Sequence, residues 1–273
     1  MGYIVGIDIG GSTTKIVGLL GGEIVSPIGV KAGDPITSAY GAFGRFLSEN
    51  NLGIADIDKV MFTGVGSSFI KESLFGIPTE KVDEFLAIGQ GGSLLAGTQR
   101  AIIVSMGTGT ALVSVDGDKI VHLGGSGVGG GTLMGLCDKM IGVRSFEHIV
   151  SMAKQGDLAN VDLTIGDITE GSLSGMGSEI TASNFGKLSD VASSGDLAVG
   201  VANMVFQTIG MFAVFAGKAE QVRDIVLTGK LSTIEPMRKV FHQLEQLHGV
   251  RFIIPENSDY ATAIGAALSA QES

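Results

Sequence analysis

A glycine-rich turn close to the start of the chain holds the first residues that could do chemistry. The stretch GIDIGGSTTKI places Gly10 and Gly11 after a short apolar run that contains Asp8. Glycine has no Cβ, so a bulky anion can approach the backbone N–H groups of such a turn. The turn therefore indicates phosphate binding, and an ordinary tight hairpin turn is the alternative.

A carboxylate beside bound phosphates calls for a cation. Asp8 lies at the end of the first apolar run, where its charge would repel phosphates. Mg²⁺ is commonly held by one or two carboxylates together with the phosphates of a substrate, so Asp8 is the predicted metal ligand. A turn-capping role is the alternative. Lys15 could offset phosphate charge or could simply lie in solvent.

A second turn of the same kind strengthens the phosphate interpretation. The stretch SMGTGTALVSVDG repeats the pattern and adds the hydroxyl groups of Thr108 and Thr110. Two facing turns of this type suit a nucleotide. Further on, GSGVGGGTLMG leads into a predicted helix, and we expect the N–H groups of Gly130, Gly131 and Thr132 to be open to phosphate oxygens. A flexible loop is the alternative there.

Two adjacent carboxylates are candidates for a general base. Asp83 and Glu84 lie in KVDEFLAIGQGG, next to apolar residues whose packing could raise a carboxyl pKa. Transfer of a phosphoryl group to a hydroxyl often needs such a base to accept the proton. The spacing alone does not choose between the two neighbours, and an ordinary carboxylate at a helix N-terminus is the alternative.

Short apolar runs separated by glycines predict the strands that position these groups. Residues 3–9, 13–20 and 23–31 form a predicted β-meander around the first turn. A helix follows over DPITSAYGAFGRFLSEN, with Asp34 and Pro35 suited to its first turn. After the strand KVMFTGV, we expect a helix at SSFIKESLF and a small-residue helix at LAIGQGGSLLAG.

The second half of the chain restarts the same pattern. AIIVSM, a glycine turn and ALVSVDGDKIVHL predict another meander, followed by several helices, the strands RDIVLTGK and RFIIPE, and a closing helix ATAIGAALSAQ. One of these helices, from about Leu197 to Ala219, is long and apolar. We therefore predict an α/β protein of two duplicated domains, residues 1–98 and 99–273, with a cleft between them.

The composition narrows the class of protein. The chain has 273 residues, a formal charge of −10 and only 17% charged residues, which disfavours binding to nucleic acid or to anionic membranes. Cys137 is the single cysteine, so no internal disulfide forms and a reducing cytoplasm fits best. The long apolar stretch carries Asn203 and Gln207, which favours a buried helix over a membrane span.

Several motifs together resemble a known family. The glycine turns, VLTGKLS and ATAIGAALS resemble the actin-like (ribonuclease H-like) superfamily of sugar kinases, Hsp70 and acetate kinase, whose duplicated domains hold ATP between them. GIDIGGSTTKI, VDEFLAIGQG, MGTGTALVSVDG, GGSGVGGGTLMGLCDKMIG, MAKQGD and TASNFGKL resemble type II pantothenate kinase in order and spacing, over essentially the whole chain. The resemblance implies a homodimer that uses ATP and Mg²⁺ to phosphorylate pantothenate, the first step of coenzyme A synthesis.

The resemblance also assigns roles to residues. It places the catalytic carboxylate on Glu84, and it implies that the loop at LTGKLS faces the adenosine. The implied nucleotide contacts are Gly10, Gly11, Ser12, Thr13, Thr14, Lys15, Thr108, Gly130, Gly131, Thr132, Leu133, Met134, Phe146 and Lys230. Two positions depart from the family. Lys230 lies where family members tend to carry smaller polar residues, so adenine recognition could differ, and His122 stands where the family carries an arginine that helps to bind pantothenate. Either pantothenate binds more weakly, or Lys119 or another donor takes over that contact, or the substrate is a different molecule.

Three other functions share parts of this pattern. A sugar or amino-sugar kinase is the nearest enzymatic alternative. An activator ATPase of radical dehydratases has similar turns, but it needs cysteines for an iron–sulfur cluster, and this chain has one. A nucleotide-dependent filament or chaperone would hydrolyse ATP without a small acceptor. For the expected homodimer, the helix from about Leu197 to Ala219 is the candidate interface, and burial in the core is its alternative.

Overall fold

The computed structural model describes residues 2–169, 177–235 and 237–271. Within these ranges the strands form two five-stranded sheets and one two-stranded sheet. The first sheet has the order β3-β2-β1-β4-β5 and contains β1 (Tyr3–Ile9), β2 (Thr13–Leu20), β3 (Glu23–Lys31), β4 (Ile57–Thr63) and β5 (Thr79–Lys81). The second has the order β12-β11-β6-β7-β8 and contains β6 (Arg100–Met106), β7 (Thr110–Asp116), β8 (Lys119–Ser126), β11 (Asp224–Thr228) and β12 (Arg251–Ile253).

The two large sheets share one topology. In the first, β1, β2 and β3 form an antiparallel meander, and β4 and β5 add in parallel on the other side of β1. In the second, β6, β7 and β8 form the meander, and β11 and β12 add in parallel beside β6. The repeated pattern predicted from the sequence is therefore confirmed as a duplicated α/β fold.

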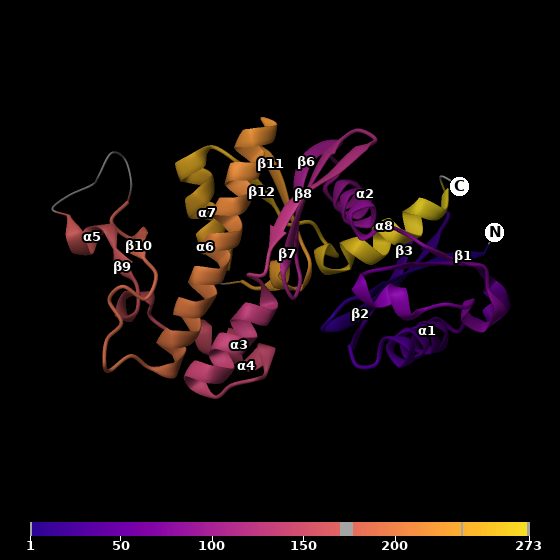
Figure 1. Ribbon diagram of the computed structural model, residues 1–273, viewed down its shortest axis with the longest axis horizontal. Helices are drawn as coiled ribbons and strands as arrows, with labels where there is room; N and C mark the ends of the chain where they lie inside the picture. The colour runs from indigo at the N-terminus through magenta and orange to yellow at the C-terminus, as the bar shows by residue number, and fades with distance from the viewer. Residues whose placement is uncertain (1, 170–176, 236, 272–273) are drawn as a thin grey trace.

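The helices cover both sheets and fill the space between them (Figure 1). Their bounds are α1 (Pro35–Asn50), α2 (Glu84–Ala96), α3 (Gly130–Ile141), α4 (Phe146–Ala153), α5 (Ile165–Ile168), α6 (Ser194–Glu220), α7 (Met237–His248) and α8 (Ala261–Leu268). Helix α1 begins as predicted, because the Asp34 carboxylate accepts a 2.8 Å hydrogen bond from Thr37 N–H and Pro35 occupies the first turn. Its buried side chains, including Phe43 and Phe46, pack on one face of the first sheet.

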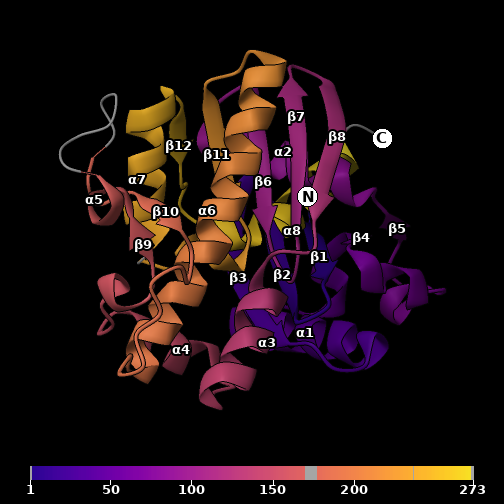
Figure 2. The same cartoon turned by 60° about the vertical axis from the view of Figure 1, so that its left-hand side comes forward.

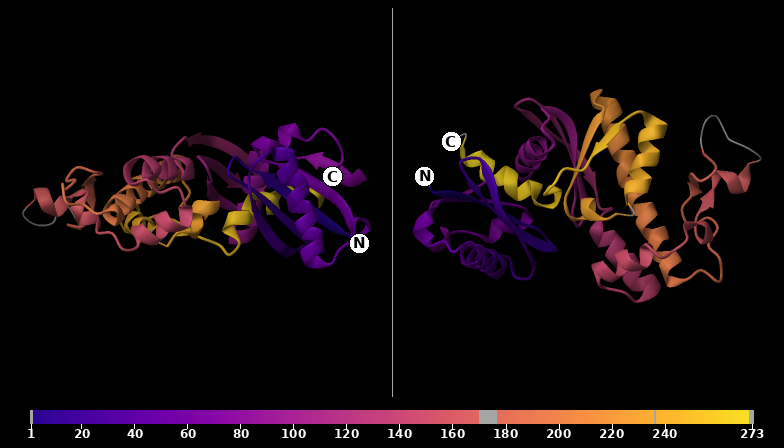
Figure 3. Two further views of the ribbon diagram at one scale, coloured as in Figure 1. Left: turned by 90° about the horizontal axis from the view of Figure 1, so that it is seen from below. Right: turned by 180° about the vertical axis from the view of Figure 1, so that it is seen from behind.

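Helices α2 and α8 form the layer between the sheets. Ile88 of α2 packs on β6 and β7, whereas Ile264 of α8 packs on Val17 of β2. The two helices approach closely because each presents a glycine to the other. A Cβ at Gly91 would lie 1.8 Å from Ala261 O, and a Cβ at Gly265 would lie 1.8 Å from Ala87 O. The C-terminal helix therefore returns to the first sheet, and Figure 3 shows this from below and from behind.

Helix α6 covers the other face of the second sheet (Figure 2). It is the one helix among the described residues that is long and apolar enough to cross a membrane, and 61% of its most apolar window is buried inside the protein. Residues such as Val205 and Ile209 are fully buried against the sheet. Packing against the core therefore accounts for its apolar character. A small lobe of α5, β9 (Leu163–Thr164) and β10 (Thr181–Ser183), which the sequence analysis did not predict, lies beside this helix.

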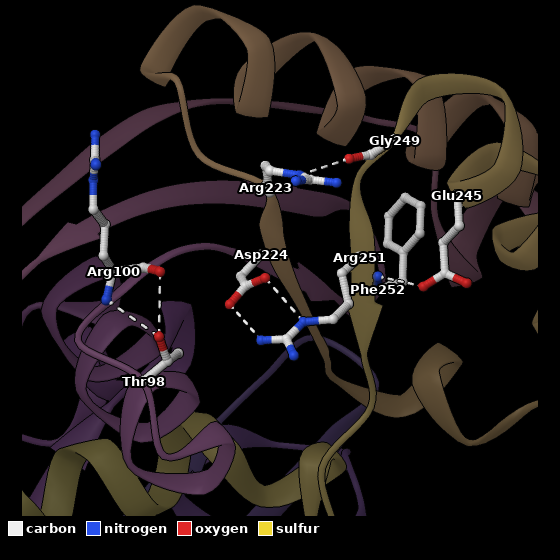
Figure 4. Close-up of polar contacts among 8 residues, drawn as sticks. All are labelled: Thr98, Arg100, Arg223, Asp224, Glu245, Gly249, Arg251 and Phe252. Atoms are coloured by element: carbon white, nitrogen blue, oxygen red, sulfur yellow. Dashed lines mark hydrogen bonds and ion pairs between the residues drawn. The ribbon is translucent and has the colours of Figure 1, made fainter.

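The two ends of the second sheet differ in the residues they carry. At the end where β6, β11 and β12 begin, Arg251 pairs with Asp224 through hydrogen bonds of 2.9 and 2.6 Å, and Arg223 donates to Gly249 O (Figure 4). These contacts are local and tie the strand starts together. The opposite end, where β6 and β11 finish in glycine turns, is the end at which such folds bind ligands.

One predicted helix is wrong. The stretch SSFIKESLF forms two short 3-10 turns, Val65–Phe69 and Leu74–Gly76, and not a continuous helix. Phe75 has a φ of 50° and Gly76 has a φ of 79°, so the backbone leaves the helical region there. The Leu74 N–H donates to the Thr79 hydroxyl, which holds the turn against β5.

Candidate active site

The two glycine turns meet between the sheets. The Ser12 hydroxyl, from the turn between β1 and β2, hydrogen-bonds the Thr108 hydroxyl, from the turn between β6 and β7, at 2.8 Å. Gly11 faces the same contact, since a Cβ there would lie 3.6 Å from Thr108 Oγ1. Predicted contact residues 96 positions apart in the chain are therefore neighbours in space.

Asp8 and Lys15 lie side by side at the end of the first sheet. They are partners in the register of β1 and β2, and Lys15 is only 9% exposed. Burial raises the pKa of Asp8, and the charge of Lys15 partly opposes this. Burial lowers the pKa of Lys15, while Asp8 and Asp259 oppose that shift. Each charge therefore lies in a place that disfavours it, and the opposite charge of its neighbour only partly offsets the effect of burial.

The surroundings of Asp8 fit a bound cation. Thr63 is its partner in the parallel register of β1 and β4, and among the described residues Thr63 Oγ1 is one of two buried side-chain polar atoms without a hydrogen-bond partner. A Cβ at Gly64 would lie 2.5 Å from Asp8 Oδ1, so only glycine leaves room there. Within the described ranges no group of three or more His, Cys, Asp or Glu could hold a metal by itself. The donor set suits a cation that takes further ligands from phosphates, as Mg²⁺ does.

The two neighbouring carboxylates Asp83 and Glu84 have different surroundings in the structure. Asp83 is the N-cap of α2, and its Oδ1 accepts hydrogen bonds from Phe85 N–H at 2.9 Å and Leu86 N–H at 3.0 Å. Glu84 is the first residue of the helix and is half-buried. Burial, followed by the charges of Asp8 and Asp83, raises the pKa of Glu84. Asp83 therefore caps the helix. Glu84 is near enough to Asp8 to feel its charge, and its raised pKa makes it a stronger base than an ordinary glutamate.

The start of α3 is fastened to the second turn. Gly130 N–H donates to Gly107 O and Gly131 N–H donates to Thr108 O, both at 2.9 Å. The expectation that these two amides are open to phosphate oxygens is therefore wrong, because carbonyl groups of the turn already accept from them. Thr132 Oγ1 donates to Gly127 O at 3.0 Å. Leu133 is fully buried in the core, so its side chain does not face a ligand, and Met134 packs against the same core.

Lys230 and Phe146 lie together on the other side of this turn. Lys230 Nζ lies 5.7 Å from the centre of the Phe146 ring, which is a cation–π distance. Lys230 follows β11 directly after Gly229, and its charge helps to lower the pKa of Lys15. Lys230, in the loop predicted to face the adenosine, is thus near enough to Lys15, beside the first glycine turn, for the two charges to interact.

His122 contacts the helix that carries Glu84. Its ring is stacked on the Phe85 ring with centroids 3.6 Å apart and planes 8° from parallel. His122 comes from β8, where it pairs with Val113, and it remains exposed. His122 therefore contacts the residue that follows Glu84 in α2.

Sequence reasoning missed a second polar region beside α6. Asp162 is fully buried and accepts hydrogen bonds from Phe185 N–H at 2.9 Å and from Asn203 Nδ2 at 2.7 Å. Thr181 and Asn203 also line a cavity of about 400 Å³ between α4, α6 and α7. The TASNFGKL motif contributes Thr181, Asn184 and Phe185 to this network, so the motif was a signal for a structural anchor.

Comparison with solved structures places the fold in a class. An activator of 2-hydroxyisocaproyl-CoA dehydratase from Clostridium difficile, with bound ADPNP, matches with a TM-score of 0.70 at 19% identity, covering 99% of this chain and 94% of that one. A ROK family glucokinase from Streptomyces griseus, in complex with glucose and AMPPNP, matches with a TM-score of 0.61 at 13% identity and full coverage of both chains. The duplicated sheets and facing glycine turns define an actin-like fold of the kind found in these ATPase and kinase structures.

Sequence comparison gives the family. The Fumble family model matches residues 98–246. Type II pantothenate kinase of Oceanobacillus iheyensis is 31% identical over 206 residues, covering 72% of this chain and 77% of the relative. The enzyme of the same name from Bacillus cereus (strain G9842) is 26% identical over 283 residues, covering 97% and 98%. The chain belongs to this family, that of Fumble and the type II pantothenate kinases.

Proposed function

We propose that the protein transfers the γ-phosphate of ATP to the 4′-hydroxyl group of pantothenate, giving 4′-phosphopantothenate for coenzyme A synthesis. The names of the relatives support the substrate, and the actin-like fold supports the nucleotide. The observation that carries the mechanism is the division of labour between Asp83, which caps α2, and Glu84, whose side chain is left for chemistry.

The proposed roles follow from the positions of the groups. Glu84 accepts the proton of the attacking hydroxyl, and its raised pKa makes it a stronger base than an exposed carboxylate. Ser12 and Thr108, at the meeting point of the two turns, bind the phosphates together with the amides of Gly11 and Ser12. The Gly10 N–H already donates to Thr13 O and closes the turn. Lys15 offsets their charge. Mg²⁺, where bound, would be held at Asp8 with phosphate oxygens and would neutralise charge on the group in transfer.

The remaining residues expected to contact the nucleotide are given more specific roles in this proposal. Gly130 and Gly131 support the second turn by donating to its carbonyl groups, and Thr108 is the residue of this turn that meets the phosphates. Phe146 and Lys230 form the adenosine side of the site, and His122 forms part of the acceptor side. We also propose that residues 1–98 and 99–273 act as two domains about this site.

Homodimer formation in the cytoplasm completes the proposal. Phe212 and Phe215 project from α6 with 46% and 57% of their surface exposed, although the rest of the helix is largely buried. Val121 and Leu123 on the edge strand β8 are also exposed. Apolar surface of this kind suits a second copy of the chain.

A sugar kinase is the second candidate, because His122 replaces the expected arginine and a ROK glucokinase shares the fold. An activator role has less support, since Cys137 is buried and burial raises the pKa of its thiol to about 11. The test is release of ADP from Mg-ATP by the purified protein with pantothenate, pantetheine, hexoses or amino sugars. Stimulation by pantothenate supports the proposal. Stimulation by a sugar instead assigns the second function, and ATP hydrolysis that no acceptor changes points to a nucleotide switch.

A further inference from the structure

The stack of His122 on Phe85 is close and nearly parallel for two side chains from different elements. The ring centroids are 3.6 Å apart and the planes differ by 8°. Phe85 is the second residue of α2, and His122 lies in the edge strand β8. Because one face of the imidazole ring is covered, the two ring nitrogens at its edge are the groups left for a ligand.

Backbone packing fixes the position of this stack. Two residues before His122, Ile120 packs directly onto Gly89 of α2, where a Cβ would lie 2.6 Å from Ile120 Cγ2. The strand is thus held against the helix by a contact that permits only glycine at position 89. His122 is exposed even so, and an exposed imidazole without a partner would sample several rotamers. The Phe85 ring restricts it to one plane.

We propose that Phe85 is a positioning residue that holds the side chain of residue 122 edge-on to the acceptor, and that this pair sets acceptor specificity. The inference rests on the proposed kinase function. Its basis is that Phe85 directly follows Glu84 at the start of α2, so the stack brings the imidazole to the end of the helix that carries the proposed base. The imidazole edge can donate a hydrogen bond to a carboxylate or carbonyl oxygen of the acceptor. A planar guanidinium could lie on the same ring and would add a second donor.

A double-mutant cycle tests the proposal. The variants F85L, H122A and F85L/H122A are compared with the native protein by measuring kcat and the KM values for pantothenate and ATP. Loss of one hydrogen bond corresponds to a rise of about three- to tenfold in the KM for pantothenate. We expect this rise in each single variant and no further rise in the double variant, because Phe85 acts through His122. The KM for ATP stays unchanged, and H122R lowers the KM for pantothenate only when Phe85 is present.

Controls separate positioning from general packing. F75L removes an exposed aromatic ring that packs on Tyr40 and Phe43 of α1, and it leaves both KM values unchanged. F85Y keeps the stack and retains the native KM. Should F85L fail to fold, F85M fills a similar volume without a ring. The ring-proton resonances of His122, identified by their absence in H122A among the four histidines, shift when Phe85 is replaced.

The outcomes distinguish the two proposals. Independent, multiplicative effects of F85L and H122A, or an equal rise in the KM for ATP, would overturn the positioning role while leaving the kinase assignment intact. Native protein without pantothenate-dependent ADP release would overturn the proposed function, and with it the inference that rests on it. An unchanged His122 resonance in F85L would also refute the stack.

Discussion

Replacement of Glu84 by Gln is the sharpest perturbation of the proposed mechanism. Glutamine keeps the size of the side chain but does not accept a proton. A positioned general base contributes about 10²–10⁴-fold to the rate, so we expect kcat to fall by about that factor. The proposed nucleotide contacts lie in the glycine turns and at Phe146 and Lys230, and not in α2, so the affinity for ATP should be unchanged.

The structure also predicts the effect of this substitution on stability. Burial and two neighbouring carboxylates raise the pKa of Glu84, which means that the folded state binds its proton more tightly than the unfolded state. Ionised Glu84 therefore reduces stability at neutral pH, and E84Q should be as stable as the native protein or more so. Asp83→Ala should do the reverse. It removes the carboxylate that accepts from Phe85 N–H and Leu86 N–H, at a cost of about 1 kcal/mol, and keeps the base.

The assay measures both properties on the same three proteins. Pantothenate-dependent ADP release gives kcat, and urea denaturation gives the free energy of unfolding. We predict an inactive, stable E84Q protein and an active, less stable D83A protein. An E84Q protein with native kcat, or one that loses as much stability as D83A, would refute the assignment of the two carboxylates.

Three further predictions follow from single contacts. Asp83→Asn keeps the helix cap but removes a negative charge that raises the pKa of Glu84. The part of the pH profile in which kcat rises with pH should therefore move to lower pH. If that part of the profile does not move, another group is responsible for it. Ser12→Ala removes the 2.8 Å hydrogen bond to Thr108, and we expect the KM for ATP to rise about three- to tenfold with little change in the KM for pantothenate, which initial-rate kinetics would measure. Gly91→Ala forces a Cβ to within 1.8 Å of Ala261 O and should lower the free energy of unfolding by about 3 kcal/mol or more. Gly44→Ala is the control, because a Cβ there meets nothing within 4 Å and should raise the free energy of unfolding slightly. Equal urea midpoints for the two variants would contradict the close contact between α2 and α8.

Local patterns predicted much of the fold. The alternation of apolar runs with glycines gave both meanders, because each strand and turn depends on neighbours in the chain. The start of α1 was equally local, since Asp34 and Pro35 are sufficient to begin a helix. The turns at 65–76 were harder, because Phe75 has a positive φ, which its residue type does not predict, and its ring packs on Tyr40 and Phe43 of α1.

Long-range contacts decided the parts of the site that the sequence did not predict. The amides of Gly130 and Gly131 form hydrogen bonds with carbonyl groups of residues 107 and 108, and no local rule places that turn against α3. The contact of Phe85 with His122 likewise depends on how β8 packs on α2. The residue types left Asp83 and Glu84 as equal candidates and the resemblance pointed to Glu84, whereas the hydrogen bonds that make Asp83 the helix cap became visible only in the structure.

The most direct test of the central claim is the chemical identity of the product. Purified protein is incubated with Mg-ATP and pantothenate, and the phosphorus signals are resolved by ³¹P NMR. The account predicts a new phosphate monoester coupled to a pair of methylene protons, which identifies the primary 4′-hydroxyl as the acceptor, and predicts that E84Q does not form it. A signal for inorganic phosphate alone, or a phosphate ester on a secondary hydroxyl, would contradict the account.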